Sequence, residues 1–359
     1  MEIFKEMARR GHEQLIFNFD KATGLKAIIA IHNTTLGPAL GGCRMLPYGS
    51  EDQAIEDALR LSEGMTYKAA AAGLDFGGGK AIIIGDPAND KSEALFRAFG
   101  RFLEAMKGRY LAGEDVGTNE EDLVQCARET SYVVGLPQDC GGSGDTGEIT
   151  AIGVLAAIRA ALTYLYGSAS LNRRHIAIQG LGKVGYQLAR HARDEGAYVT
   201  AADINPHVVG EAASELDIEP ADPWTILETP CDVLSPCALG NVVNHETIDK
   251  LNCRIIAGPA NNQLEDPSLG DVLQHRNILY APDFITSAGG LIQVANERSH
   301  YQEERVRKQV NGIYELLLAI FHRAGENHRS TVSVALDMVD ERMKLLDAVH
   351  RIYSSSGEK

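Results

Sequence analysis

The sequence HIAIQGLGKVGYQLARHARDEGAYVTAAD, residues 175–203, predicts the fold of the second half of the chain. An apolar run at 175–180 leads into glycines at 180, 182 and 185, and a helical pattern continues to about residue 194. A second apolar run ends in an acid, Asp203. This order of strand, G-x-G-x-x-G, helix and strand-terminal acid is typical of a dinucleotide-binding β-α-β unit.

Each residue of this motif has a separate expected role. Gly180 allows a tight turn, Gly182 lets the backbone approach a pyrophosphate, and Gly185 lets the helix pack closely on the strand. The helix N-terminus, which begins with Lys183 and Val184, stabilises the phosphate charge. The alternative is a tight strand-turn-helix connection that binds no ligand.

The acid at the end of the second strand distinguishes the two nicotinamide dinucleotides. Asp203, followed by Ile204, is expected to accept a hydrogen bond from the ribose 2′-hydroxyl and to repel a 2′-phosphate. The expected cofactor is therefore NAD rather than NADP, unless Asp203 is only a solvated surface acid.

Outward from this motif, strands and helices continue to alternate. Three further apolar runs, at 231–238, 253–260 and 277–284, are spaced widely enough for crossover helices or loops. This alternation favours a parallel, doubly wound sheet. After Gly290 the pattern is helical to the C-terminus.

The N-terminal part also mixes strands with helices. Strand patterns occur at 13–20, 25–34, 81–87 and from 109, a glycine-rich loop is expected at 37–45, and one long helix at 51–73. The Gly- and Pro-rich segment 135–149 is expected to be a linker. The fold class is therefore α/β with two domains, an N-terminal α/β domain over 1–135 and a Rossmann domain over 136–330.

Composition narrows the class of partner. The net charge of −15 argues against nucleic acid or an anionic membrane surface. Six cysteines are scattered without metal-ligand spacing, so no metal site is expected. No signal peptide or membrane span is expected, and a cytoplasmic enzyme with free thiols is the simplest interpretation.

A second motif, GMTYKAAAAGLDFGGGK at residues 64–80, contains two lysines. Lys68 is expected near a helix end, and Lys80 directly follows a turn at Gly77–Gly79 and precedes an apolar strand. Poor solvation and a second ammonium nearby lower a lysine pKa, which would let Lys80 act as a base. Asp115 is expected at a strand end before a helix, where it is either a catalytic carboxylate or a helix-capping acid; Thr118 or Asn119 is better placed to cap.

The chain resembles the amino-acid dehydrogenases of the Glu/Leu/Phe/Val family from about residue 3 to 350. The resemblance is carried, in the family's order, by IIAIHNTTLGPALGGCRM, GMTYK, GGGK, EDVGTN, GLGKVG, SPCALG, PANNQL, YAPDF and SAGGLIQVANE. It implies that the C-terminal segment, from about residue 331 to 359, returns to the first domain. This domain would bind the substrate and form oligomers. It also implies a homo-oligomer, commonly an octamer.

The resemblance assigns the chemistry to three residues. Lys68 holds the carboxylate of an L-amino acid, and hydride passes from its Cα to the nicotinamide. Lys80 then activates a water that attacks the resulting imine, and Asp115 relays protons as the products, a 2-oxo acid and ammonia, form. The resemblance also places Thr150 and Asn262 near the nicotinamide. It places Ala238 and Leu239 along the cofactor.

The side-chain pocket of the substrate is expected to be uncharged. The resemblance places it, beside Gly41, at Leu40, Gly113, Val134, Leu291 and Val294. A glutamate side chain would be buried there without a partner, so glutamate is excluded. Leucine dehydrogenases carry Ala at the position of Gly113, and the missing methyl favours phenylalanine, unless Gly113 serves only backbone geometry.

Several alternatives stay open at this point. Leucine or another branched amino acid is the second choice of substrate, and tryptophan the third. A catalytically silent NAD-binding protein is another possibility, as is a hydroxy-acid dehydrogenase, for which neither His32 nor His175 is suitably placed. The chain departs from the family at Ser287, where Asn is usual, and at Pro259, where a small residue is common.

Overall fold

The computed structural model describes residues 1–238 and 240–353. The chain forms two compact units. The first comprises Met1–Asp145, Val294–Tyr301 and Val339–Lys359, and the second comprises Thr146–Gln293 and Gln302–Met338. The functional domain assignments made above stay predictions.

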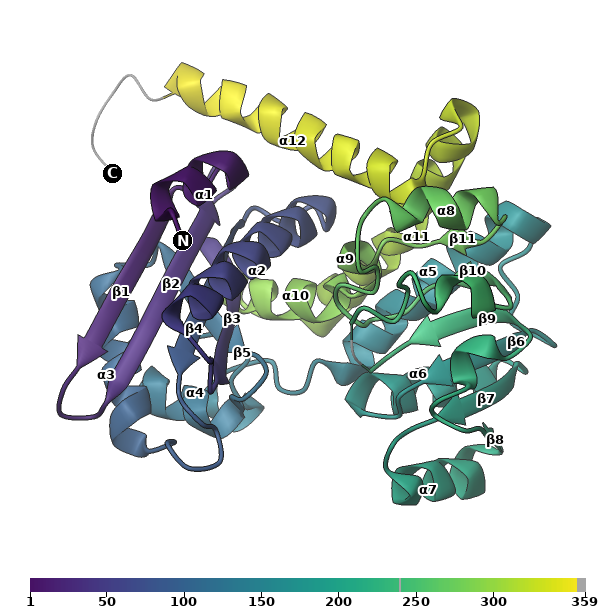
Figure 1. Ribbon diagram of the computed structural model, residues 1–359, viewed down its shortest axis with the longest axis horizontal. Helices are drawn as coiled ribbons and strands as arrows, with labels where there is room; N and C mark the ends of the chain where they lie inside the picture. Colours follow the sequence, from purple (N-terminus) through teal and green to yellow (C-terminus); the bar gives the residue numbers. More distant parts are fainter. Residues whose placement is uncertain (239, 354–359) are drawn as a thin grey trace. The chain divides into compact units, whose positions relative to one another are not determined.

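A five-stranded mixed sheet organises the first unit (Figure 1). Its strands are β1 (Gln14–Asp20), β2 (Leu25–Asn33), β3 (Ala39–Leu46), β4 (Gly77–Ile84) and β5 (Tyr110–Glu114). They lie in the order β1-β2-β4-β3-β5. The strands β1 and β4 run antiparallel to β2, whereas β3 runs parallel to both β4 and β5.

Helices cover both faces of this sheet. They are α1 (Ile3–Arg10), α2 (Glu51–Ala71), α3 (Glu93–Ala105) and α4 (Glu120–Ala127). Alternate residues of β2 divide between the two cores: Ile29 and Ile31 face the aromatic residues of α3, and Ile28 and Ala30 face α2. The interior strands of the sheet are therefore buried on both sides.

Two local predictions were wrong, and both concern glycines. The expected loop at 37–45 is mostly strand β3 inside the sheet, and the expected turn at Gly77–Gly79 is the start of β4. A Cβ built on Gly41 would lie 1.9 Å from the Gly79 carbonyl oxygen, and one on Gly78 would lie 2.1 Å from the Thr66 nitrogen. The glycines allow strands and helix to approach closely rather than turn the chain.

The second unit contains a six-stranded parallel sheet. Its strands are β6 (His175–Gln179), β7 (Tyr198–Ala202), β8 (Glu219–Pro220), β9 (Cys231–Pro236), β10 (Cys253–Ile256) and β11 (Leu279–Tyr280). The order β11-β10-β9-β6-β7-β8 runs outward in both directions from β6 and β9. The predicted doubly wound fold is confirmed, and its topological switch lies between β6 and β9.

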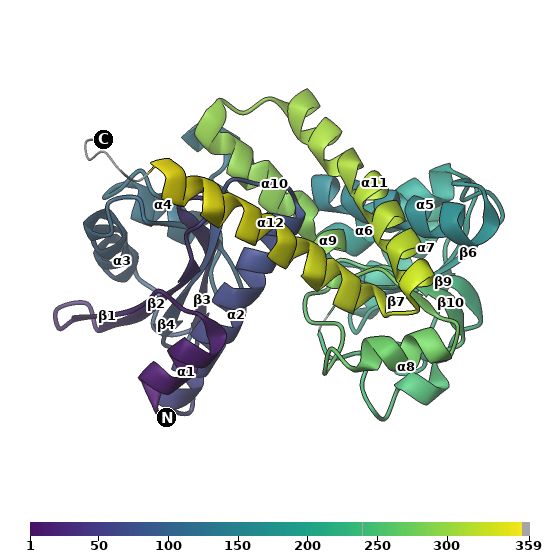
Figure 2. The same cartoon turned by 90° about the horizontal axis from the view of Figure 1, so that it is seen from above.

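The helices α5 to α8 are interspersed with the strands of this sheet, whereas α9 to α12 follow its last strand (Figure 2). They are α5 (Gly147–Tyr166), α6 (Lys183–Asp194), α7 (Pro206–Leu216), α8 (Leu269–His275), α9 (Asp283–Thr286), α10 (Ala288–Ala295), α11 (Glu303–Asn327) and α12 (Thr331–Tyr353). Short 3-10 turns occur at Gln138–Cys140, Ile226–Glu228, Ile248–Lys250 and Asn296–Ser299.

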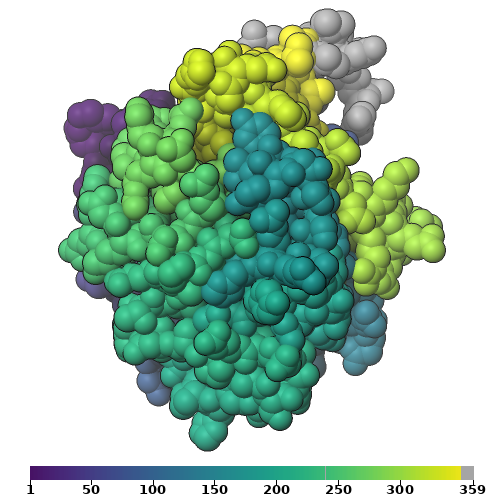
Figure 3. Space-filling view, turned by 90° about the vertical axis from the view of Figure 1, so that its right-hand side faces the viewer, coloured from purple at the N-terminus to yellow at the C-terminus, as the bar shows by residue number. Residues whose placement is uncertain are grey.

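Among the described residues, one helix, α5, is long and apolar enough to cross a membrane by length and composition alone. In the structure 67% of its apolar window is buried, and it packs against α6 and α11. We therefore interpret α5 as a buried helix of the second unit. Part of the surface of this unit is seen in teal and green in Figure 3.

Candidate active site

The first unit brings Lys80 and Asp115 into direct contact. Lys80 lies on β4, is 5% exposed, and places its Nζ 2.7 Å from Oδ2 of Asp115. Asp115 directly follows β5, as predicted, and β3 lies between the two strands. On β3 the facing residue is Gly42, whose added Cβ would lie 2.7 Å from Asp115 Cβ and 3.1 Å from Lys80 Nζ. A glycine at this position therefore leaves the space that the ion pair fills.

Asp115 has a second cationic partner, which the sequence did not suggest. Arg44 Nε donates to the same Oδ2 at 2.7 Å. Burial alone would raise the pKa of Asp115, but the Lys80 ammonium and the Arg44 guanidinium outweigh it and lower the pKa to about 2. The carboxylate is therefore ionised in the resting pair.

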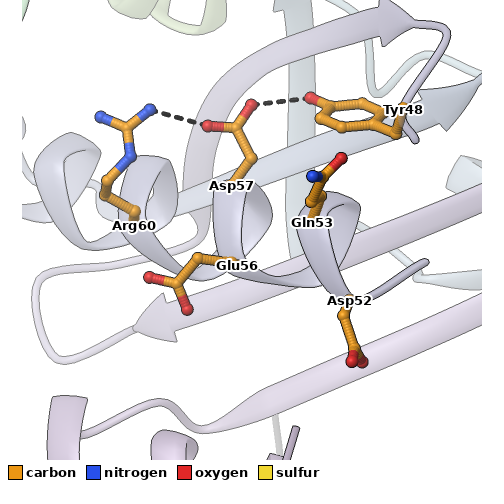
Figure 4. A pocket seen from close by; sticks show the side chains of 6 residues that line it. All are labelled: Tyr48, Asp52, Gln53, Glu56, Asp57 and Arg60. Atoms are coloured by element: carbon orange, nitrogen blue, oxygen red, sulfur yellow. Dashed lines mark hydrogen bonds and ion pairs between the residues drawn. The ribbon is translucent and has the colours of Figure 1, made fainter. Parts of the chain in front are cut away.

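Arg44 links the ion pair to a second carboxylate, Asp57, which lies on α2. Arg44 Nη1 lies 3.1 Å from Oδ2 of Asp57, which also accepts a hydrogen bond of 2.7 Å from the Tyr48 hydroxyl. Arg60 Nη2 donates to the other oxygen of Asp57 at 2.7 Å. In Figure 4 Tyr48 and Arg60 approach Asp57 from opposite sides. The described contacts therefore form a chain from Lys80 to the surface.

The outer end of this chain borders an open hollow of about 520 Å³. It is lined by Tyr48, Asp52, Gln53, Glu56, Asp57 and Arg60 (Figure 4). Three carboxylates among six lining residues would repel the carboxylate of an amino acid. The hollow is therefore not the substrate site.

The loop after Asp115 is fixed to β3. Thr118 Oγ1 donates to the Cys43 carbonyl at 2.7 Å and accepts from the Asp115 amide at 3.0 Å. As expected, Asp115 does not cap the next helix, because Asn119 forms a reciprocal capping box with Asp122. Asp115 is thus available for another role.

Lys68 occupies the last turn of α2, as predicted, and is half-buried. The helix lies on the sheet at its glycines, since an added Cβ on Gly41 would lie 3.4 Å from Met65 Cγ. Leu40, the neighbour of Gly41, is buried on β3. The close approach at Gly41 and Gly78 therefore positions the segment that carries Lys68.

Three of the expected pocket residues are grouped by the structure. The Val134 amide donates to the Ala112 carbonyl at 2.9 Å, which holds it beside β5. An added Cβ on Gly113 would lie 3.7 Å from Val134 Cγ2, and one on Gly135 would lie 3.6 Å from Val294 Cγ1. Leu291 precedes Val294 by three residues on α10 and is buried.

The glycines of the dinucleotide motif lie at close approaches and at the N-terminus of α6. Gly180 has a φ of +98°, and a Cβ there would lie 2.8 Å from Ala238 Cβ. A Cβ on Gly185 would lie 2.0 Å from the Gly180 carbonyl oxygen, which explains the close packing of α6. A Cβ on Gly182 would meet no atom within 4 Å, so space for a phosphate lies at this helix N-terminus.

Asp203 follows β7, as predicted, but also supports the glycine loop. Its Oδ2 accepts from the Leu181 amide at 2.8 Å, and its Oδ1 accepts from the Asn205 amide at 2.9 Å. Each carboxylate oxygen can accept a further hydrogen bond, so a ribose hydroxyl still fits. Ile204, next to it, is highly exposed.

The other expected cofactor residues lie in the second unit. Thr150 is in the first turns of α5 and donates to the Thr146 carbonyl at 2.8 Å. Asn262 is exposed with a φ of +53°, on a loop held by buried Gln263, which donates to the carbonyls of Gly258 and Ala260. Leu239 lies outside the described residues.

The structure also accounts for one family departure. The Ser287 hydroxyl donates to the Asp283 carbonyl at 2.6 Å, within its own helical segment. Nothing in the structure explains Pro259.

Four residues of the first unit were missed by the sequence reasoning. Arg44 and Gly42 lie in the segment GPALGGCRM, which was interpreted as a loop, and Asp57 lies on the helix that follows. Glu297 accepts from the amides of Gly135 and Ser143 at 2.9 and 2.7 Å. Recognising 39–46 as a strand would have placed Arg44 two residues beyond Gly42 on the same face.

Comparisons with known proteins identify the family of the chain. A family model described as "Glu/Leu/Phe/Val dehydrogenase, dimerisation domain" matches residues 12–132. A second, described as "Glutamate/Leucine/Phenylalanine/Valine dehydrogenase", matches 141–219 and 205–349.

Individual relatives match almost the whole chain. Phenylalanine dehydrogenase of Thermoactinomyces intermedius is 50% identical, over 98% of this chain and 96% of its own. Leucine dehydrogenase of Geobacillus stearothermophilus is 46% identical, over 99% and 97%. The crystal structure of L-tryptophan dehydrogenase from Nostoc punctiforme matches with a TM-score of 0.85 and 42% identity, over 96% of this chain and 99% of that chain.

Proposed function

Because the chain belongs to the glutamate/leucine/phenylalanine/valine dehydrogenase family, we propose that it oxidatively deaminates L-phenylalanine, reversibly, to phenylpyruvate and ammonia. The enzyme class, an amino-acid dehydrogenase with a nicotinamide cofactor, follows from the family and the Rossmann-like unit. Relatives named for phenylalanine and for leucine have similar identity, so the choice of substrate needs an argument from the pocket.

The observation that carries the choice is the space at Gly113. No positive φ marks Gly113, and an added methyl would make only ordinary contacts with Val134. Backbone geometry therefore does not require glycine there, and the absent methyl leaves volume beside Val134. A larger, uncharged side chain such as that of phenylalanine makes use of this volume.

In the proposed mechanism Lys68 binds the substrate carboxylate. NAD, held at the glycine loop of the second unit, would supply the acceptor for the hydride that leaves the substrate Cα. In its neutral form Lys80 takes a proton from the water that attacks the imine carbon. Asp115 then takes a proton from Lys80 and delivers it to the leaving amine as the carbinolamine collapses. Their direct contact at 2.7 Å supports proton exchange between the two groups.

NAD rather than NADP is proposed from the position of Asp203. A 2′-phosphate beside this carboxylate would place like charges together. Gly182, Lys183 and Val184 would surround the pyrophosphate. We assign Thr150 and Asn262 to the nicotinamide, and Ala238 and Leu239 to the length of the cofactor, from the family resemblance. Equal turnover with NADP would contradict the role of Asp203.

The proposal is tested by the absorbance of NADH, followed with ammonia and a panel of 2-oxo acids. We expect the highest kcat/KM with phenylpyruvate and no turnover without ammonia. A higher value with the leucine-derived or tryptophan-derived oxo acid would overturn the substrate assignment. No turnover with any oxo acid would instead indicate a silent nucleotide-binding protein.

The setting of the enzyme is also proposed. A homo-oligomer is in line with the dimerisation domain named by the family model, and an octamer is the family expectation. A reduced, cytoplasmic environment suits six cysteines that form no disulfide.

A further inference from the structure

Arg44 contacts two carboxylates that lie far apart in the sequence, Asp57 and Asp115. Its side chain is 18% exposed, on β3. Nε donates to Asp115 at 2.7 Å, and Nη1 donates to Asp57 at 3.1 Å. The guanidinium is thus held between the proposed catalytic carboxylate and α2.

We propose that Arg44, anchored by Asp57, is a positioning residue that orients Asp115 so that its Oδ1 faces the substrate. The inference rests on the proposed roles of Lys80 and Asp115. Both cations donate to Oδ2, and no described residue donates to Oδ1. The two oxygens of Asp115 therefore have different roles: Oδ2 faces Lys80 and Arg44, and Oδ1 is left for the proton that passes to the substrate.

Asp57 is itself held firmly enough to act as an anchor. Tyr48 and Arg60 donate to its two oxygens, and its carboxylate is mostly buried. Burial would raise the pKa of Asp57, but the Tyr48 hydrogen bond and the two arginines lower it, so Asp57 stays ionised. The planar guanidinium matches this task, because its donors are fixed relative to one another.

A lysine could not replace both contacts of Arg44. Its single ammonium is a point charge, and it cannot hold two carboxylates on separate elements in one plane. It would nevertheless keep a positive charge near Asp115. Charge and orientation can therefore be separated by substitution.

The pH dependence of kcat depends on every charged or titratable group whose charge acts on Asp115 or on Arg44. Lys80 lies on β4, Arg44 and Cys43 on β3, and Tyr110 on β5. Tyr48 precedes α2, and Asp57 lies on it. Burial raises the pKa of Cys43 and of Tyr110 well above the usual range, so neither titrates near neutrality. A change of the rate profile on substitution of Arg44 is thus assigned to the Lys80–Asp115 pair that Arg44 contacts.

The test is the pH profile of kcat for amino-acid oxidation, measured for Arg44→Gln and for the unchanged enzyme. Removing a cation makes a proton harder to lose from either member of the pair. We expect the acid limb of the profile, where kcat rises with pH, to move to higher pH by about one unit. We also expect kcat to fall at least about tenfold, with KM for the amino acid changed less than about threefold.

Two further variants separate charge from orientation. Arg44→Lys should restore the position of the acid limb but only part of kcat. Asp57→Asn keeps both cations at Asp115, so it should lower kcat several-fold without an upward shift of the limb. Asp57→Asn also keeps the test decisive if Arg44→Gln does not fold.

Arg10→Gln is the matched control. Arg10 is similarly buried and is also paired with carboxylates on α2, Glu56 and Glu63, but it has no described contact with Asp115. The limb should stay in place in this variant. A wild-type profile and kcat in both Arg44→Gln and Asp57→Asn would overturn the inference, whereas an inactive unchanged enzyme would overturn the proposed function instead.

Discussion

Two glycines that pair across neighbouring strands have opposite surroundings. Gly42 on β3 lies opposite Gly113 on β5 in the ladder. A Cβ on Gly42 would collide with Asp115, whereas one on Gly113 would fit against Val134. One glycine is required by the proposed catalytic pair, and the other leaves room in the proposed pocket.

We predict that Gly113→Ala lowers the phenylalanine-to-leucine ratio of kcat/KM by about tenfold, because one methyl in an apolar pocket is worth about 1–3 kcal/mol. The fold should be preserved, since the new methyl makes only ordinary contacts. Steady-state kinetics with both amino acids checks this result. An unchanged or increased ratio would refute the pocket role of Gly113.

Gly42→Ala is the companion substitution, with the same added methyl on the facing residue. The new Cβ would lie 2.7 Å from Asp115 Cβ and 2.8 Å from the Glu114 carbonyl, so the strand end must shift. We expect kcat to fall by roughly a hundredfold for both amino acids, because small misplacements of reacting groups are costly. A variant that changes only the substrate ratio would contradict the assigned role of Gly42.

At the scale of elements, the segment 135–146 is fixed at both ends rather than free. It was predicted to be a linker up to residue 149, but α5 already begins at Gly147. Glu297, on the short turn after α10, accepts from the Gly135 and Ser143 amides. Val134 is next to Gly135, and Val294 is three residues before Glu297. The hydrogen bonds of Glu297 therefore position part of the proposed pocket.

We predict that Glu297→Gln raises KM for the amino acid more than it lowers kcat. The amide keeps one acceptor oxygen and turns an NH2 group toward a backbone donor, which costs about 1–3 kcal/mol. Steady-state kinetics and thermal unfolding measure the two effects. Glu303→Gln is the matched control, because Glu303 makes an exposed ion pair with Arg307; equal effects in both variants would contradict the role of Glu297.

At the scale of the molecule, the first unit contains a buried histidine pair. The rings of His12 and His32 lie 4.7 Å apart, and His12 is 9% exposed. Burial, and then the neighbouring His32, lower the pKa of His12 to about 4, and burial also lowers that of His32. His12 Nδ1 finds no partner among the described residues, so a second proton there would be buried unpaired.

The stability of the protein should therefore fall as the pH drops from about 6.5 toward 4. In that window the unfolded chain binds protons that the folded histidines refuse, so the free energy of unfolding decreases. We expect the fall in Tm between pH 7.5 and 5 to be smaller in His12→Gln. An equal fall in both proteins would show that other groups cause the loss.

The sequence predicted most of the elements, because apolar periodicity marks them directly. The prediction failed at β3, because Gly41 and Gly42 give this strand no apolar alternation. Glycine occurs there because a Cβ at either position would collide with neighbouring residues. Lys80 and Asp115 were found because each adjoins an apolar strand. Arg44 and Glu297 were not, because their contacts join segments far apart in the chain, and local patterns carry no signal for such pairs.

Lys80 is placed on an interior strand of the first unit, with β2 on one side and β3 on the other. Its backbone cannot loosen without separating the sheet, and amides of such strands exchange with solvent only when the whole unit opens. The proposed base is therefore carried by the most persistent part of the unit. Warming should abolish turnover and melt this sheet in a single cooperative event, with no interval in which a folded sheet has lost its chemistry.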